Sequence, residues 1–209
     1  MISIKRLILI ISLLSFQVFA QPTPERAHPW SLIASMGYGN YQNMYQSDGQ
    51  TPLGRFGIAV QLANIRAISL GFETGVQSGN HMRLNVTQDL VDEYGGLPFE
   101  TTLKPMLDLL VTAKSAPSDK IPVILIAKAG ITYRQLQFFR ETVNNLIKTN
   151  AEVQVGFGYQ ISRYVNLNLL YQHVFGGNPN FRSDPITLKG QISKIPVEQA
   201  LLLGFSISA

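Results

Sequence analysis

Charged side chains that recur on the polar side of alternating segments are the residues of this sequence best suited to do chemistry. They are Arg55, Glu73, Lys104, Asp108, Lys128, Arg134, Glu152 and Glu198. Each lies where apolar and polar residues alternate with a period of two, a pattern that indicates a strand with two unlike faces. Charges shut away from water must pair, because an isolated buried charge is strongly unfavourable. We therefore expect these residues to form a structural network of ion pairs and hydrogen bonds in the protein interior.

Residue types that serve catalysis or metal binding are sparse. Cys is absent from the 209 residues, which removes disulfides, thiolate zinc sites and thiol nucleophiles. His28 and His81 stand apart from any metal-ligand spacing. The glycines follow the strand alternation and do not gather into a phosphate-binding loop. We expect no enzymatic activity, no catalytic residue, no cofactor and no metal site.

Eight alternating stretches must position these side chains. They span 29–41, 54–64, 67–78, 102–114, 122–135, 150–161, 164–175 and 196–208. Most are close to the roughly 9–11 residues that a tilted strand needs to cross a bilayer. Short turns alternate with long connections, which lie at 42–53, 79–101, 136–149 and 176–195. This arrangement predicts an all-β fold, an eight-stranded antiparallel up-and-down transmembrane barrel with both termini on one side. Within the third long connection, Phe138 to Lys148 lacks a period of two and is compatible with a short helix.

Glycine distinguishes a membrane barrel from a soluble barrel of the lipocalin kind, which would hold its apolar face inside. The glycines of the polar face are Gly37, Gly39, Gly57, Gly71, Gly75, Gly130, Gly156, Gly158 and Gly204. Glycine weakens a strand unless another chain segment approaches closely. The interior of an eight-stranded barrel is barely wide enough for its side chains, so it demands such small residues. We therefore expect the polar face inside and the apolar face, with Leu70, Val155 and Leu203, toward lipid.

The first twenty residues predict a signal peptide at 1–20, followed by a barrel domain at 21–209. Lys5 and Arg6 precede a short apolar stretch and a small-residue cleavage site that ends at Ala20. A membrane anchor is the alternative, but the apolar stretch is shorter than the roughly 20 residues of a spanning helix. Only 14% of the chain is charged, and the net charge of +4 forms no basic stripe. A nucleic-acid partner is therefore not expected.

These features resemble the small outer-membrane barrels of the OmpA/OmpX-like superfamily over the whole mature chain. The resemblance implies export to the outer membrane and contact with its lipid and lipopolysaccharide. It also implies that the C-terminal strand, Leu203 to Ala209, carries the signal read by the barrel-assembly machinery, although that family usually ends in an aromatic residue. Some outer-membrane lipid A deacylases use a lipid-facing His with a Ser two residues later. His173 has Phe175 at that position, so the nucleophile is missing.

The function expected from the sequence is therefore non-enzymatic. We expect an outer-membrane barrel with a structural or surface-interaction role, in which the loops at 42–53, 79–101, 136–149 and 176–195 meet a host or surface ligand. The alternatives are a small transport barrel for ions or apolar molecules and a lipid-modifying enzyme. A wide pore is disfavoured, because open aqueous channels belong to barrels of about sixteen strands.

Overall fold

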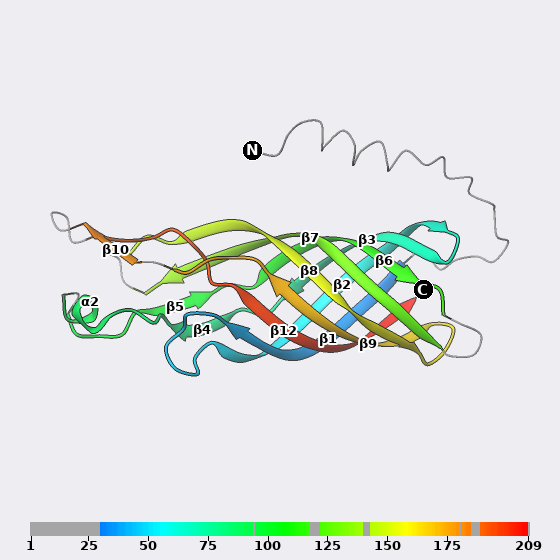
Figure 1. Ribbon diagram of the computed structural model, residues 1–209, viewed down its shortest axis with the longest axis horizontal. Helices are drawn as coiled ribbons and strands as arrows, with labels where there is room; N and C mark the ends of the chain where they lie inside the picture. The colour runs from blue at the N-terminus through cyan, green and yellow to red at the C-terminus, as the bar shows by residue number, and fades with distance from the viewer. Residues whose placement is uncertain are drawn as a thin grey trace, which may run out of the picture.

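A closed antiparallel barrel forms the body of the protein (Figure 1). The computed structural model describes residues 30–93, 95–117, 122–139, 143–179, 181–184 and 189–208. The predicted signal peptide at 1–20, His28 and Ala209 lie outside these residues. Within the described ranges, no helix is both long enough and apolar enough to traverse a membrane.

Eight strands make the barrel wall, as the sequence predicts. In the order of their hydrogen-bonded neighbours they are β1 (Trp30–Tyr41), β2 (Gln50–Ile65), β3 (Ile68–Gln77), β6 (Met106–Ser115), β7 (Val123–Phe138), β8 (Leu146–Gln160), β9 (Val165–Val174) and β12 (Glu198–Ser208). The wall closes where β12 pairs with β1, with Ala34 opposite Phe205. Closure leaves no strand edge along the barrel, which a membrane-spanning sheet requires.

The two faces of the wall lie as the alternation predicts. Val155 and Leu203 are 51% and 48% exposed, whereas Glu73 and Lys128 are 1% and 4% exposed. Leu70 also lies on the outward face and is half-buried. An exposed belt of apolar side chains therefore surrounds a lumen that contains charged residues. This confirms the predicted orientation and excludes the soluble, apolar-in alternative.

Inward glycines allow neighbouring strands to curve closely around this narrow lumen. A Cβ atom added to Gly37, Gly130 or Gly156 would come within 2.0 Å of a backbone carbonyl oxygen on the adjacent strand. No side chain fits at such a distance. At these three positions the glycine is thus explained by the close backbone approach that the sequence pattern indicates.

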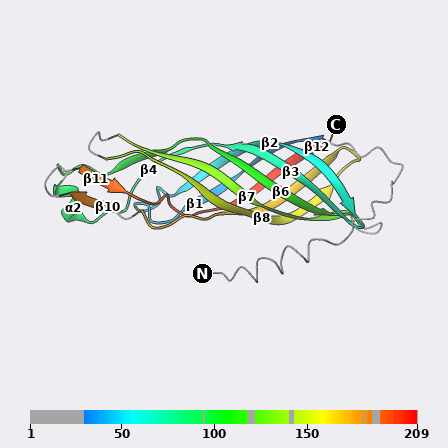
Figure 2. The ribbon, with the colours of Figure 1, turned by 90° about the horizontal axis from the view of Figure 1, so that it is seen from above.

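The sheet continues beyond the barrel at the end that carries the long connections. This extension contains β4 (Asn80–Arg83), α2 (Gln88–Glu93), β5 (Glu100–Leu103), β10 (Phe181–Asp184) and β11 (Lys189–Ile192), together with the ends of β7 and β8. Because β5 pairs with β7, the extension is continuous with the wall. Figures 1 and 2 show it at the opposite end of the molecule from the C-terminus. We call this part, with the β1–β2 loop, the head.

Two local features of the head differ from the sequence analysis. The short helix considered between Phe138 and Lys148 is absent from the described residues of that segment, where β7 runs to Phe138 and β8 begins at Leu146. Residues 140–142, between these strands, lie outside the described part. A helix, α2, instead occurs in the 79–101 connection, where none was expected.

Candidate functional site

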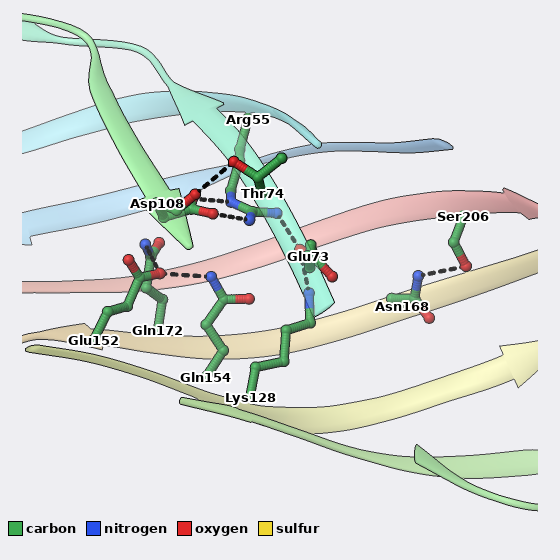
Figure 3. A network of polar contacts seen from close by, with 10 residues as sticks. All are labelled: Arg55, Glu73, Thr74, Asp108, Lys128, Glu152, Gln154, Asn168, Gln172 and Ser206. Atoms are coloured by element: carbon green, nitrogen blue, oxygen red, sulfur yellow. Dashed lines mark hydrogen bonds and ion pairs between the residues drawn. The ribbon is translucent and has the colours of Figure 1, made fainter. Parts of the chain in front are cut away.

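The first charged cluster of the lumen is centred on Arg55 of β2. Its Nε and Nη2 atoms donate to the two carboxylate oxygens of Asp108 at 2.8 and 2.7 Å. Its Nη1 atom donates to Glu73 Oε1 at 2.7 Å, and Lys128 Nζ donates to the same oxygen at 2.8 Å. These residues come from β2, β3, β6 and β7, so the cluster ties together four strands of the wall (Figure 3). Bidentate Arg–carboxylate pairs of this kind are both strong and geometrically specific.

Glycines make room for the Arg55 guanidinium. A Cβ atom on Gly75 would lie 2.6 Å from Arg55 Nη2 and 2.8 Å from Arg55 Cζ. One on Gly57 would lie 3.4 Å from Arg55 Nη1. The planar group therefore lies against the bare backbone of β2 and β3. At Gly75, close packing against a charged side chain, as well as backbone approach, explains the glycine.

A second cluster lies in the lumen nearer the head. Arg134 of β7 pairs with Glu198 of β12 at 3.5 Å, and its Nη1 atom donates to the carbonyl oxygen of Pro196 at 2.7 Å. Gln77 Nε2 donates a hydrogen bond to the other Glu198 oxygen. The Tyr41 ring lies beside the guanidinium, 5.9 Å from Arg134 Cζ. These four side chains are almost completely inaccessible to solvent.

Glu152 of β8 forms a third group, with neutral partners. Gln154 and Gln172 each donate an amide N–H to Glu152 Oε1, at 2.7 and 2.8 Å. Gln172 is on β9, directly opposite Gln154 of β8. Figure 3 shows both amides turned toward the carboxylate, on the side of the lumen that faces Asp108.

Seven of the eight charged residues singled out by the sequence lie in the lumen, and Lys104 does not. Lys104 is exposed and lies with Pro105 in a break between β5 and β6. Proline has no N–H for the strand ladder, so the alternation does not continue through it. On one side of the break β5 buries odd-numbered residues such as Leu103, and on the other β6 buries even-numbered ones such as Asp108. The expectation that Lys104 shares the interior face with Asp108 is therefore wrong.

The lumen also contains apolar side chains that the sequence analysis missed. One buried cluster consists of Leu53, Ile124, Ile126, Leu170, Ala200 and Leu202. Several of these residues lie in runs that are apolar on both faces, such as Ile124–Ile126 and Leu201–Leu203. A run of this kind hides its period, because inward and outward residues look alike. The interior therefore combines salt bridges with ordinary apolar packing.

The head has an apolar core of its own, which was not expected from the sequence. Its buried members are Tyr41, Met44, Met82, Leu84, Phe99, Leu103, Leu136, Phe138, Val143, Leu146, Ile192 and Ile195. Bridges between Met44 and Leu84 and between Val143 and Gly190 join the separate long connections. The connections therefore pack into one folded unit at the mouth of the barrel.

An ion pair fixes the outer side of the head. Arg83 of β4 donates to both carboxylate oxygens of Asp48, at 2.6 and 3.0 Å, and its guanidinium lies 4.7 Å from the Tyr45 ring centroid. These hydrogen bonds hold the pKa of the Asp48 carboxyl below its usual value. The β1–β2 loop is thereby attached to the β4 strand.

Groups that suit metal binding are not gathered in the described residues. No cluster of three His, Asp or Glu side chains occurs there. His81 is exposed and contacts Thr102 at 3.2 Å. His173 is half-buried, with its ring 4.5 Å from that of Phe175.

Comparison with known proteins places this geometry among outer-membrane barrels. No family model and no curated protein sequence matches the chain. Among solved structures, OprG from Pseudomonas aeruginosa aligns with a TM-score of 0.53 at 10% identity, over 87% of this chain and 97% of that one. Neisserial surface protein A gives 0.47 at 10% identity over 86% and 97%, and Ail of Yersinia pestis gives 0.46 at 8% over 86% and 95%. At such identities the likeness concerns the fold, and the alignment with OprG, together with the closed wall and apolar belt, carries it. The chain has the fold of the small eight-stranded outer-membrane β-barrels.

Proposed function

We propose that this protein is an integral outer-membrane barrel whose lumen is plugged by ion pairs and whose head acts in surface interactions. The observation that carries the proposal is the apolar core of the head, which packs on the barrel mouth directly above the Arg134–Glu198 pair. A folded head presents a fixed surface, and a preorganised surface binds with a lower entropic cost than free loops. The role we propose is therefore display of a binding surface rather than passage of solute.

The partners we propose follow from the two exposed parts of the molecule. The apolar belt contacts the lipid of the outer membrane, including lipopolysaccharide, and the C-terminal strand β12 contacts the barrel-assembly machinery. The head meets the ligand outside the cell. We propose no enzymatic activity, and replacement of His173 by Ala is expected to leave the lipid A composition of the cells unchanged.

Topology in the membrane is tested with single cysteines, which the natural chain lacks. In Leu97→Cys the thiol is in the exposed part of the head, and in Arg163→Cys it is in the β8–β9 turn at the opposite end. A membrane-impermeant maleimide added to intact cells is expected to label the first variant. The second is expected to react only after the outer membrane is permeabilised. The reverse pattern, or equal labelling of both, would contradict the proposed orientation.

Conductance in planar bilayers separates the plugged barrel from a transport barrel. The purified protein is expected to give no discrete current steps, under conditions in which a sixteen-stranded porin gives its usual steps. Regular steps from the wild-type protein would refute the plug and support ion transport. The Arg134→Ala variant tests the layer beneath the head, and it is also expected to stay silent because the Arg55 cluster lies below it.

A further inference from the structure

The fully buried charges of the lumen are not matched one to one. Among the described residues the buried cations are Arg55, Lys128 and Arg134, and the buried carboxylates are Glu73, Asp108, Glu152 and Glu198. Three cations thus face four carboxylates. Lys114 also points inward, is partly buried near the short-turn end of the barrel and interacts with the charge of Glu73, but it forms no ion pair among the described residues. The ion pairs therefore leave one fully buried carboxylate without a directly paired cation.

Glu152 is the carboxylate without a cation. Glu73 pairs with Arg55 and Lys128, Asp108 pairs with Arg55, and Glu198 pairs with Arg134. No ion pair to Glu152 is formed by any residue in the described ranges. Arg55 attracts Glu152 electrostatically, but its Nε, Nη1 and Nη2 atoms already donate to other carboxylates, and the charge of Asp108 repels Glu152.

Three buried oxygen atoms of this group have no donor. They are Glu152 Oε2, Gln154 Oε1 and Gln172 Oε1, none of which accepts a hydrogen bond from a described residue. The three side chains are at most 1% exposed. Both glutamine amides are turned toward the carboxylate, on directly paired positions of β8 and β9 (Figure 3). Rotation about the last side-chain bond would exchange the two hydrogen bonds donated to Glu152 Oε1 for carbonyl oxygens turned toward Glu152, because an amide offers donors on one side and an acceptor on the other.

The chemistry of these atoms selects the ligand. Carboxylate and amide oxygens are the ligands of hard cations. A single negative charge is balanced by a single positive charge, whereas a divalent ion would leave a surplus positive charge beside Arg55 in a dry interior. We propose that Glu152, Gln154 and Gln172 bind one monovalent alkali cation, sodium or potassium, inside the lumen.

Stability in different salts tests the site. The protein is refolded from urea into detergent micelles in sodium chloride, potassium chloride or N-methylglucamine chloride at equal ionic strength, so that the cation is present when the lumen closes. The wild-type protein is expected to have a higher thermal midpoint in an alkali salt than in the large organic cation, because a ligand that binds only the folded state stabilises it. Glu152→Gln is expected to abolish this difference. Glu100→Gln, which neutralises an exposed carboxylate of β5, is the matched control and should keep it.

Line broadening of the sodium NMR signal provides a second measurement that does not depend on the folding of a variant. Broadening by the wild-type protein, removed by excess potassium, is expected. Equal midpoints of the wild-type protein in all three salts would overturn the proposal, and would indicate that a proton neutralises Glu152. A salt difference that survives in Glu152→Gln would overturn it as well. Labelling of the two cysteine variants tests the proposed function separately, so the two failures are distinguishable.

Discussion

Removal of Arg55 is the most direct test of a dry, ion-paired lumen. In Arg55→Leu, Asp108 loses both hydrogen bonds that described residues donate to its carboxylate, whereas Glu73 keeps Lys128 at 2.8 Å. Asp108 thus becomes a second buried carboxylate without a cation. Breaking a buried ion pair by removing one partner costs about 3–5 kcal/mol of unfolding free energy. We expect a loss of that size.

The double variant Arg55→Leu/Asp108→Leu tests whether the loss comes from the unpaired carboxylate. Replacing both partners of a buried ion pair by apolar residues is often neutral, so the double variant is expected to recover most of the lost stability. Lys104→Leu, which removes an exposed cation, is the matched control and should stay within about 0.5 kcal/mol of the wild-type protein.

Urea unfolding in lipid or detergent provides the assay. Loss of the compact, heat-modifiable band on electrophoresis measures unfolding of the barrel. Fluorescence of the single tryptophan, Trp30, which is exposed on the apolar belt, follows the same unfolding at the barrel surface. If Arg55→Leu costs less than about 1 kcal/mol, Asp108 is solvated in the variant. The lumen would then contain enough water to hydrate a bare carboxylate, and the argument for a plug would fail.

Three further predictions concern other parts of the chain. Gly75→Ala should destabilise the barrel, because the new methyl group would lie 2.6 Å from Arg55 Nη2, whereas Gly54→Ala, with no atom within 4 Å of the added group, should be nearly neutral in the same urea assay. The folded pKa of Asp48 is lower than its ordinary value of 3.8, so the ion pair with Arg83 stabilises the β1–β2 loop above pH 3.8 and is lost as the pH falls through the folded pKa. Amide hydrogens of this loop should then exchange faster. Asp48→Asn should show that faster exchange already at neutral pH. Leu136→Ala, a change at a fully buried position of the head, should cost the head about 2–5 kcal/mol and expose it to protease, while the heat-modifiable band of the barrel persists.

The wall of the barrel could be predicted because each strand has one face toward the lumen and one toward the outside. A period of two is then sufficient to assign every residue of an uninterrupted strand. This is why Glu73, Lys128 and Glu152 were placed correctly although their partners are far away in the chain. The prediction for Lys104 was wrong because Pro105 interrupts the strand ladder, so that the inward residues are odd-numbered before it and even-numbered after it. The alternation therefore predicts the inward face correctly only where a strand is continuous.

The head could not be predicted because its core is assembled from residues that are distant in sequence. Met44, Phe99, Val143 and Ile192 lie in four different connections, and each stands in a segment too short to show a period. Nothing local indicates that such residues meet. The lack of a cation beside Glu152 could not be predicted for a related reason. The alternation indicates which charged residues face inward, but not which of them contact one another.

Strand β7 connects the lumen with the core of the head. The inward residues of β7 pass from Lys128 in the first cluster, through Arg134 in the second, to Leu136 and Phe138 in the core of the head. One face of one strand therefore changes from ionic to apolar partners without a hinge between them. Because β5 also pairs with this end of β7, the head is held as an extension of the wall rather than as a tethered loop. A ligand bound to the head would accordingly meet a surface whose orientation relative to the membrane is set by strands continuous with the wall of the barrel.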